Sequence, residues 1–249
     1  MGEHKAPEER VWPFHTELEW CLGASSTPKE ASLTSLCLEQ EKHLSSNIPL
    51  ILKLQKIPWL LRKAIDASPI HLHITQYTRA DPKTHEPRTP LDLVQRTSAG
   101  LGVIVDNRVL DWEERMHENY VFGRVITRAM FIAGEEEGRP DVRVCVDGGG
   151  RDQEEVARFL RGEVYADGVG TGAGGFLVEA GSGSGGGEES GSGLWVQTLE
   201  CSEASAWSAE TIWGFEMVNG ERYLSRVVAV VGKGKYQLGR CVFGLLNRE

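Results

Sequence analysis

Two runs rich in β-branched and aromatic residues, 213–218 and 221–231, are joined by Asn219-Gly220, and this junction constrains the fold most strongly. Asn-Gly is the preferred pair for a type I′ turn, whose two positive-φ positions give a twist that matches the flanking strands. After Gly232-Lys233-Gly234, a third β-rich run covers 236–246. The sequence therefore predicts that its last part forms an antiparallel meander.

Further strands are predicted before this meander. Period-two alternation begins at Ile70, where His71, His73, Thr75 and Tyr77 share one face of a predicted strand. We expect about eight to ten strands with hairpin-type links, which predicts a mainly β, closed antiparallel barrel, since closure removes exposed edges. A barrel of about eight strands holds one small ligand. The expected strands are 70–78, 89–97, 103–114, 120–133, 142–146, 194–200 and 207–217, with a polar turn at 116–119.

Two helices are expected over 47–67. Pro49 suits a first helical turn, and Pro58 removes a backbone donor, which predicts a break near Lys56-Ile57. The apolar face of this pair either packs as a lid over one end of the barrel or gates a ligand mouth. A further short helix is predicted over 151–161, capped by Asp152.

The chain divides into two parts in this interpretation. Residues 1–43 form an N-terminal strap, with one or two helical turns expected over 34–43, and 44–249 form the barrel domain. The Gly/Ser-rich stretch 168–193 is low in complexity and has few apolar side chains to bury. Such a composition predicts a disordered loop within the barrel domain.

Composition narrows the classes of partner. The net charge of −9 disfavours nucleic acid and anionic membrane surfaces, which bind positively charged proteins. No stretch reaches the roughly 18 apolar residues of a membrane span, and no secretory signal is visible near Met1. The five cysteines lack a CxxC pair. We therefore expect a cytoplasmic protein with reduced thiols and without zinc.

The motifs for common cofactors are weak. His71 and His73 share a strand face, but no third metal ligand is evident nearby, so we expect a hydrogen-bonded or outward pair and no metal site. Gly181-Ser-Gly-Ser-Gly185 matches a nucleophile motif only through low-complexity repetition. No phosphate-binding loop follows a predicted strand. We expect no cofactor.

Candidate site residues are aromatic and polar positions spread over several predicted strands, as in a lumen with apolar walls and a few polar groups. The phase of the strand around Arg226 stays open: either Arg226 faces inward with Leu224 and Val228, or Tyr223 and Val227 do. An inward arginine needs a carboxylate partner or a carbonyl-bearing or anionic ligand. The candidate catalytic residues are Gln95, Arg226 and Tyr77, and the candidate substrate-binding residues are Trp59, Trp112, Phe122, Arg128, Trp195, Trp213, Tyr223 and Tyr236.

Several segments carry a family resemblance. Val94-Gln-Arg-Thr97, Asn107-Arg-Val-Leu-Asp-Trp112, Phe122-Gly-Arg124, Trp213-Gly-Phe-Glu216 and Gly220-Glu-Arg-Tyr-Leu-Ser-Arg-Val-Val228 resemble those of small lipocalin-like proteins of filamentous fungi. The resemblance covers roughly 46–246. The group is similar to barrel proteins of secondary-metabolite clusters, some of which are cofactor-free cyclases of the Diels–Alder type. The turn Ser98–Gly102 departs from the family's Gly- and Thr-rich turn.

Two functions are compatible with a hollow barrel. The resemblance implies a cofactor-independent cyclase or isomerase that folds a hydrophobic polyketide or terpenoid intermediate into a reactive conformer, with one or two donors on a carbonyl. The alternative is a non-catalytic carrier or sensor of a lipophilic molecule. In both cases the expected partner is a hydrophobic small molecule.

Overall fold

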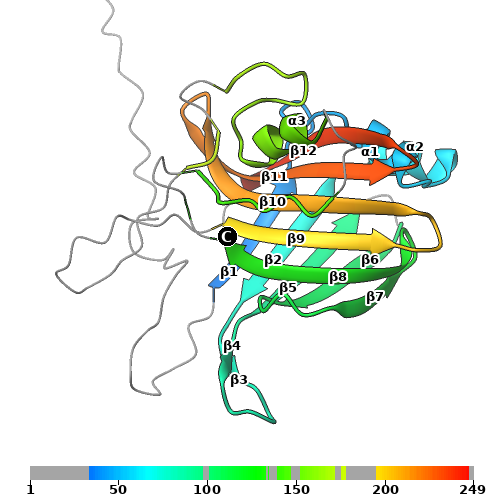
Figure 1. Cartoon of the computed structure of the whole chain (residues 1–249). Coiled ribbons are helices and arrows are strands. Elements are labelled where there is room, and N and C mark those ends of the chain that lie inside the picture. The colour runs from blue at the N-terminus through cyan, green and yellow to red at the C-terminus, as the bar shows by residue number, and fades with distance from the viewer. Residues whose placement is uncertain are drawn as a thin grey trace, which may run out of the picture.

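The computed structural model describes residues 34–97, 101–132, 134, 139–146, 152–171, 175–177 and 195–246. These residues form a mainly β protein that is built on one ten-stranded antiparallel sheet (Figure 1). The strands of this sheet are β1 (Thr34–Gln40), β2 (Ile70–Gln76), β5 (Pro90–Thr97), β6 (Val103–Val109), β7 (Arg115–Asn119), β8 (Gly123–Ile132), β9 (Trp195–Ser202), β10 (Trp207–Val218), β11 (Glu221–Gly232) and β12 (Lys235–Leu245). A separate hairpin consists of β3 (Arg79–Ala80) and β4 (Pro87–Arg88).

The sheet joins two meanders into a nearly closed barrel. Its strand order is β6-β5-β2-β1-β12-β11-β10-β9-β8-β7. The meanders meet where Leu38 pairs with Leu245 and Gln40 pairs with Phe243, between β1 and β12. The end strands β6 and β7 complete the wall on the opposite side without a ladder between them. This architecture confirms the predicted antiparallel barrel.

The hairpin between β10 and β11 confirms the turn prediction. Asn219 and Gly220 have φ values of 53° and 83°, the left-handed conformations that a type I′ turn requires. Val218 pairs with Glu221 directly before and after the turn. The register then places Trp213 opposite Arg226, which matters for the site below.

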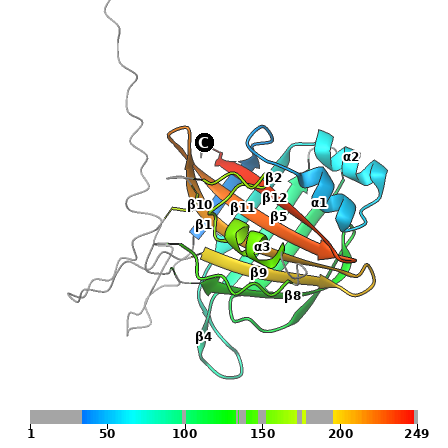
Figure 2. The same cartoon turned by 45° about the horizontal axis from the view of Figure 1, so that its top comes forward.

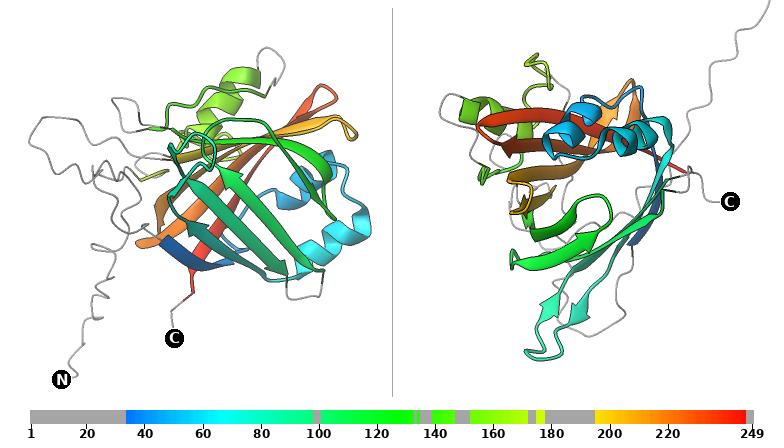
Figure 3. Two further views of the ribbon diagram at one scale, coloured as in Figure 1. Left: turned by 90° about the horizontal axis from the view of Figure 1, so that it is seen from below. Right: turned by 90° about the vertical axis from the view of Figure 1, so that its right-hand side faces the viewer.

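Helices α1 (Ile48–Leu54) and α2 (Trp59–Ala67) lie at one end of the barrel, on the two sides of the expected break (Figure 2). Ile51 of α1 packs among inward-facing strand residues such as Ala209 and Val228. Gly239 permits this close approach, because an added Cβ would lie 2.4 Å from Ile51 Cδ1. Helix α1 is therefore a plug in the mouth of the barrel, and Figure 3 (right) looks onto this end.

Helix α3 (Asp152–Leu160) covers the outer face of the sheet, as the prediction for 151–161 requires. Its Val156, Phe159 and Leu160 are fully buried against outward-facing side chains that include Trp195 and Ile212. Strand β11 is consequently buried on both faces. A second core cluster, which contains Leu38, Leu72, Trp213 and Phe243, fills the barrel interior beyond the plug.

Three secondary-structure predictions are wrong. Residues 34–40 form β1 rather than helical turns, so the barrel begins inside the range assigned to the strap. Residues 115–119 form β7, and the turn that was expected at 116–119 comes directly after it. Residues 142–146 are not a strand, because the N–H groups of Cys145 and Val146 donate to the Glu210 side chain instead of a neighbouring strand.

Other predictions fall largely outside the described residues. These are the strap before residue 34 and most of the Gly/Ser-rich stretch 168–193. Within the described residues, no helix has the length and apolar character needed to cross a lipid bilayer.

Candidate ligand-binding site

The barrel encloses a cavity of about 150 Å³ that is bounded at the mouth by α1 and α2. Most of its wall is apolar, with polar side chains on β1, β5, β6, β7, β8, β9, β10 and β11. At the mouth the cavity reaches residues 118–122, which are the end of β7 and the turn after it. The apolar lining includes Ile51, Leu52, Ile65, Leu72, Leu93, Ile104, Val125, Trp213, Val228 and Phe243, and the polar lining includes Gln40, Gln55, Gln95, Thr97, Asp106, Arg108, His117, Thr198, Glu200, Thr211 and Arg226.

Arg226 projects into this lumen, which resolves the open phase of β11. Its guanidinium carbon lies 5.1 Å from the centroid of the Trp213 ring on β10. Its Nη2 lies 3.5 Å from Sγ of Cys241, the residue opposite on β12. The described residues supply neither a carboxylate within ion-pair distance of Arg226 nor a hydrogen-bond acceptor for its Nε. Arg226 is thus a cation held over an aromatic face in a mainly apolar barrel.

Gln95 and Thr97 line the same lumen from β5. Gln95 lies opposite Leu72 on β2 and Ile104 on β6, so its amide is flanked by apolar side chains. The Thr97 hydroxyl is buried and has no hydrogen-bond partner among the described residues. Both side chains are available to a guest near the mouth.

A charged cluster, formed by Asp106, Arg108, His117 and Glu200, lies where β6 approaches β7 and β8. Arg108 is 6 % exposed; its Nε donates to Asp106 Oδ2 at 2.7 Å, and its Nη2 donates to Glu200. His117 Nδ1 lies 3.3 Å from Asp106 Oδ1. Burial by itself would lower the pKa of Arg108, but the carboxylates of Asp106 and Glu200 outweigh it and raise that pKa above its ordinary value. Arg108 therefore stays charged inside the wall.

Three hydrogen-bond donors on the lumen wall have no partner among the described residues: Thr97 Oγ1, Arg108 Nη1 and Arg226 Nε. Buried polar atoms are nearly always hydrogen-bonded in proteins, so such atoms on one cavity wall need explanation. All three groups can donate to an oxygen atom. The cavity is chemically suited to a guest with oxygen acceptors on an otherwise apolar frame.

The structure brings together some of the predicted site residues. Gln95, Arg226, Phe122 and Trp213 all line the cavity. Phe122 packs edge-on against Trp207, with ring centroids 5.9 Å apart, at the mouth end. Trp213 stacks on Phe243 deeper in the barrel, with ring centroids 6.5 Å apart.

The other aromatic candidates do not line the cavity. Trp59 is 63 % exposed on α2, and Trp195 is buried on the outer face of the sheet beneath α3. Tyr236 also faces outward, and its hydroxyl donates to Glu155 of α3 at 2.8 Å. None of the three is among the residues that line the cavity, because tryptophan and tyrosine occupy the outer layer of this barrel as well as its interior.

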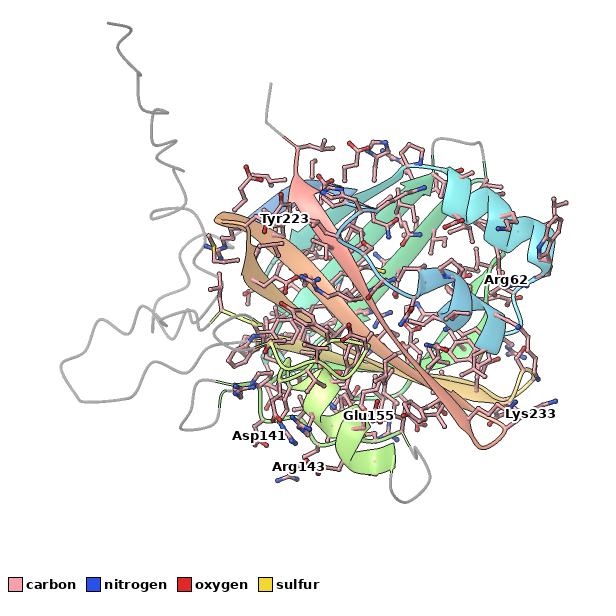
Figure 4. The ribbon with its side chains drawn as sticks, turned by 90° about the horizontal axis from the view of Figure 1, so that it is seen from above. Arg62, Asp141, Arg143, Glu155, Tyr223 and Lys233 are labelled. Carbon is pink, nitrogen blue, oxygen red and sulfur yellow. The ribbon has the colours of Figure 1, made fainter. Side chains whose placement is uncertain are left out.

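Tyr223 faces outward too, opposite in phase to Arg226. Its hydroxyl donates to Glu221 at 2.7 Å, and this hydrogen bond raises the pKa of Tyr223 to about 12. In Figure 4, Tyr223 and Lys233 mark opposite ends of the barrel, with Arg62 of α2 toward the Lys233 end. Tyr223 therefore lies far from the mouth.

The last three candidates lie at the edges of the barrel wall. Arg128 is on the outer side of β8, where it pairs with Glu114 at 2.5 Å. Trp112 has a positive φ of 61° in the link between β6 and β7, and Tyr77 follows the end of β2. None of the three lines the cavity. Arg128 is on the outward face of its strand, and Trp112 and Tyr77 lie outside the strands.

The histidine pair on β2 has an ordinary environment. His73 Nε2 lies 2.8 Å from Ser35 Oγ on β1, on the outer face of the barrel. No cluster of three or more His, Cys, Asp or Glu side chains in the described part of the chain is arranged to hold a metal ion.

Sequence reasoning missed the charged cluster. Strand β6 carries Ile104, Asp106 and Arg108 on one face, and Val103 and Val105 on the other. In a barrel strand the apolar valines are expected to face inward. Here Val103 and Val105 are 47 % and 54 % exposed, and the face with Asp106 and Arg108 lines the lumen. Two opposite charges at i and i+2 on one strand were the available signal, since their side chains can pair on the same face.

No protein-family model, curated protein or solved structure matches the chain. We therefore infer its function from the barrel and the side chains that line it.

Proposed function

We propose that the barrel binds a small, mainly apolar molecule that carries a carbonyl or carboxylate oxygen, and that it acts on this molecule as a cofactor-independent isomerase or cyclase. The observation that carries this proposal is the set of three unpartnered donors, Thr97 Oγ1, Arg108 Nη1 and Arg226 Nε, on the wall of one apolar cavity. Arg226 is the principal anchor, because it is the cation that faces the lumen without a paired carboxylate among the described residues.

The cavity volume limits the guest. An apolar cavity of about 150 Å³ holds benzene, whereas sites for drug-sized ligands span about 300–1,000 Å³. The cavity of about 150 Å³ therefore suits one six-membered ring with a short substituent. A longer polyketide or terpenoid intermediate would place its reacting ring in the lumen and its remainder in the mouth beside α1 and α2.

The walls supply two means of catalysis without a cofactor. Enclosure between Trp213, Phe243 and Val228 restricts a flexible guest to few conformers, which lowers the entropic part of a cyclisation barrier. The guanidinium of Arg226 stabilises negative charge that develops on a carbonyl oxygen. Both contributions suit the kind of cyclase that the lipocalin-like resemblance implies.

The anchor is tested with a matched pair of ligands, acetophenone and ethylbenzene, which differ mainly in the carbonyl oxygen. We expect Arg226→Met to weaken the binding of acetophenone by about 10- to 100-fold, since a hydrogen bond to a charged group contributes about 1.5–3 kcal/mol. Binding of ethylbenzene should change less than about threefold. Dissociation constants are measured by ligand-observed NMR titration.

Arg96→Met is the matched control, because Arg96 is on β5 next to Gln95 but points out of the barrel and is exposed. It should leave both affinities unchanged. Equal acetophenone affinity in Arg226→Met and the unaltered protein would refute the anchor role. A metabolite that co-purifies and is released unchanged after incubation would favour a carrier over an isomerase.

A further inference from the structure

We propose that His117 and Asp106 form a proton-transfer pair in the lumen, so that the reaction class is isomerisation of a carbonyl compound through its enolate. This inference rests on the proposed ligand site and assigns it a base. The geometry that carries it is the placement of an imidazole 3.3 Å from a carboxylate oxygen, on the wall of the same cavity that contains Arg226.

The pair is held rigidly by its neighbours. Asp106 cannot rotate freely, because its Oδ2 accepts from Arg108 Nε at 2.7 Å and Arg108 is in turn bound to Glu200. The remaining oxygen, Oδ1, is buried, accepts no hydrogen bond among the described residues, and lies at an ion-pair distance of 3.3 Å from His117 Nδ1. A carboxylate at this position favours the tautomer with hydrogen on Nδ1, which leaves Nε2 as the acceptor. Such contacts are often long without substrate and tighten in the reactive complex.

Closure of the barrel wall does not require the histidine. Arg108 on β6 is paired with Glu200 on β9, and this ion pair links the two strands without the histidine. The side chain of His117 is 19 % exposed, and the residue lines the cavity, so it can reach both guest and solvent. A base that exchanges protons with water during turnover needs this combination.

The chemistry balances without a co-reactant. His117 Nε2 takes a proton from the carbon α to the carbonyl, and the C–H electron pair becomes a C=C bond while the carbonyl π pair moves onto oxygen. Arg226 stabilises the resulting enolate oxygen. When the guest has a β,γ double bond, His117 returns the proton to the γ carbon, and the product is the conjugated enone. One proton is moved, and no electron is gained or lost overall.

The test uses the full chain and cyclohex-3-en-1-one, a six-membered ring of suitable size. The unaltered protein should convert it to cyclohex-2-en-1-one, which is followed by the ultraviolet absorbance of the conjugated product. His117→Gln should lower the rate about 10²- to 10⁴-fold, the usual contribution of a general base. His43→Gln, which changes an exposed histidine in the turn after β1, should leave the rate unchanged.

A second measurement separates catalysis from folding and binding. In D2O, the unaltered protein should speed the exchange of the α hydrogens of cyclohexanone, which is observed by proton NMR. The variant His117→Gln should still bind cyclohexanone but should no longer speed this exchange.

The outcomes distinguish the two proposals. Arg226-dependent binding of cyclohexanone without protein-catalysed exchange would overturn the proton-transfer role and leave the ligand site standing. Exchange that persists within about threefold in His117→Gln would assign the base to another group. Absence of any binding would remove the proposed function itself.

Discussion

Glu210 shows how single polar residues hold the outer layer of this barrel. Its side chain is fully buried, and its Oε2 accepts from the N–H groups of Cys145 at 2.7 Å and Val146 at 3.1 Å. Gln197 donates to its other oxygen. These bonds replace the strand pairing that 142–146 lacks. Glu210 is thus a structural carboxylate, unlike Asp106 in the lumen.

Burial raises the pKa of Glu210 above its ordinary value of 4.5, although hydrogen bonds from Val146, Cys145 and Gln197 oppose the shift. The folded state therefore binds this proton more tightly than the unfolded chain does. Its stabilising effect is complete below the unfolded-state pKa and is lost as pH rises through the folded-state pKa. We expect the free energy of unfolding of the unaltered protein, minus that of Glu210→Gln, to fall as pH rises above the ordinary pKa of 4.5, in urea titrations. A difference that grows with pH would contradict this assignment.

Strand β10 depends on a glycine where it passes beneath the outer layer. A Cβ on Gly214 would lie 2.4 Å from Trp195 Cδ1 and 2.7 Å from Phe176 Cδ1. Both rings belong to the packed outer cluster, so neither can move aside freely. Gly214 lets the two aromatic side chains lie directly on the β10 backbone.

Gly214→Ala should lower the free energy of unfolding by about 1–3 kcal/mol, the usual cost of overpacking a filled core. The value is obtained from urea denaturation followed by tryptophan fluorescence. Gly170→Ala is a suitable comparison, because its added Cβ would meet only Glu163 O at 3.9 Å. Equal stability of the two variants would show that the outer layer yields easily.

The elements differ in how far the sequence could predict them. Asn219-Gly220 and the proline at 58 are local signals, and the hairpin and the helix break follow from them directly. The phase of β11 could not be predicted, because helix α3 buries Val227 and Ala229 while the lumen buries Leu224 and Val228. Strand β6 turns its charged face toward the lumen and its valines outward. It can do so because Arg108 pairs with Glu200 on β9, a strand that is distant in sequence.

The candidate site could be predicted only in part, because the sequence does not show which strand face lines the lumen. Gln95, Phe122, Trp213 and Arg226 could be proposed from residue type, but a list of aromatic residues does not distinguish the lumen from the layer under α3. His117 and its partners depend on the approach of β6 to β7 and β8, which only the closed barrel brings about.

At the scale of the whole molecule, Arg108 joins β6 to β9 where the barrel closes. Arg108→Met would leave the carboxylates of Asp106 and Glu200 facing each other without their shared cation, and breaking a buried ion pair in this way costs about 3–5 kcal/mol. We expect that loss in urea denaturation, together with faster amide hydrogen exchange in β6 and β7. Replacing all three as Asp106→Asn, Arg108→Met and Glu200→Gln should restore most of the stability. Unchanged exchange in β6 would show that the barrel wall holds without this cluster.

The join between β1 and β12 also bears on how the protein is made. Strands β1, β2, β5 and β6 leave the ribosome long before β12, the strand on which β1 pairs. Until β12 emerges, the early meander has unpaired strand edges that are prone to association with other chains. Nascent molecules of this protein consequently have no interior to offer a guest until β12 has been translated, and that interval is when they would gain most from a chaperone.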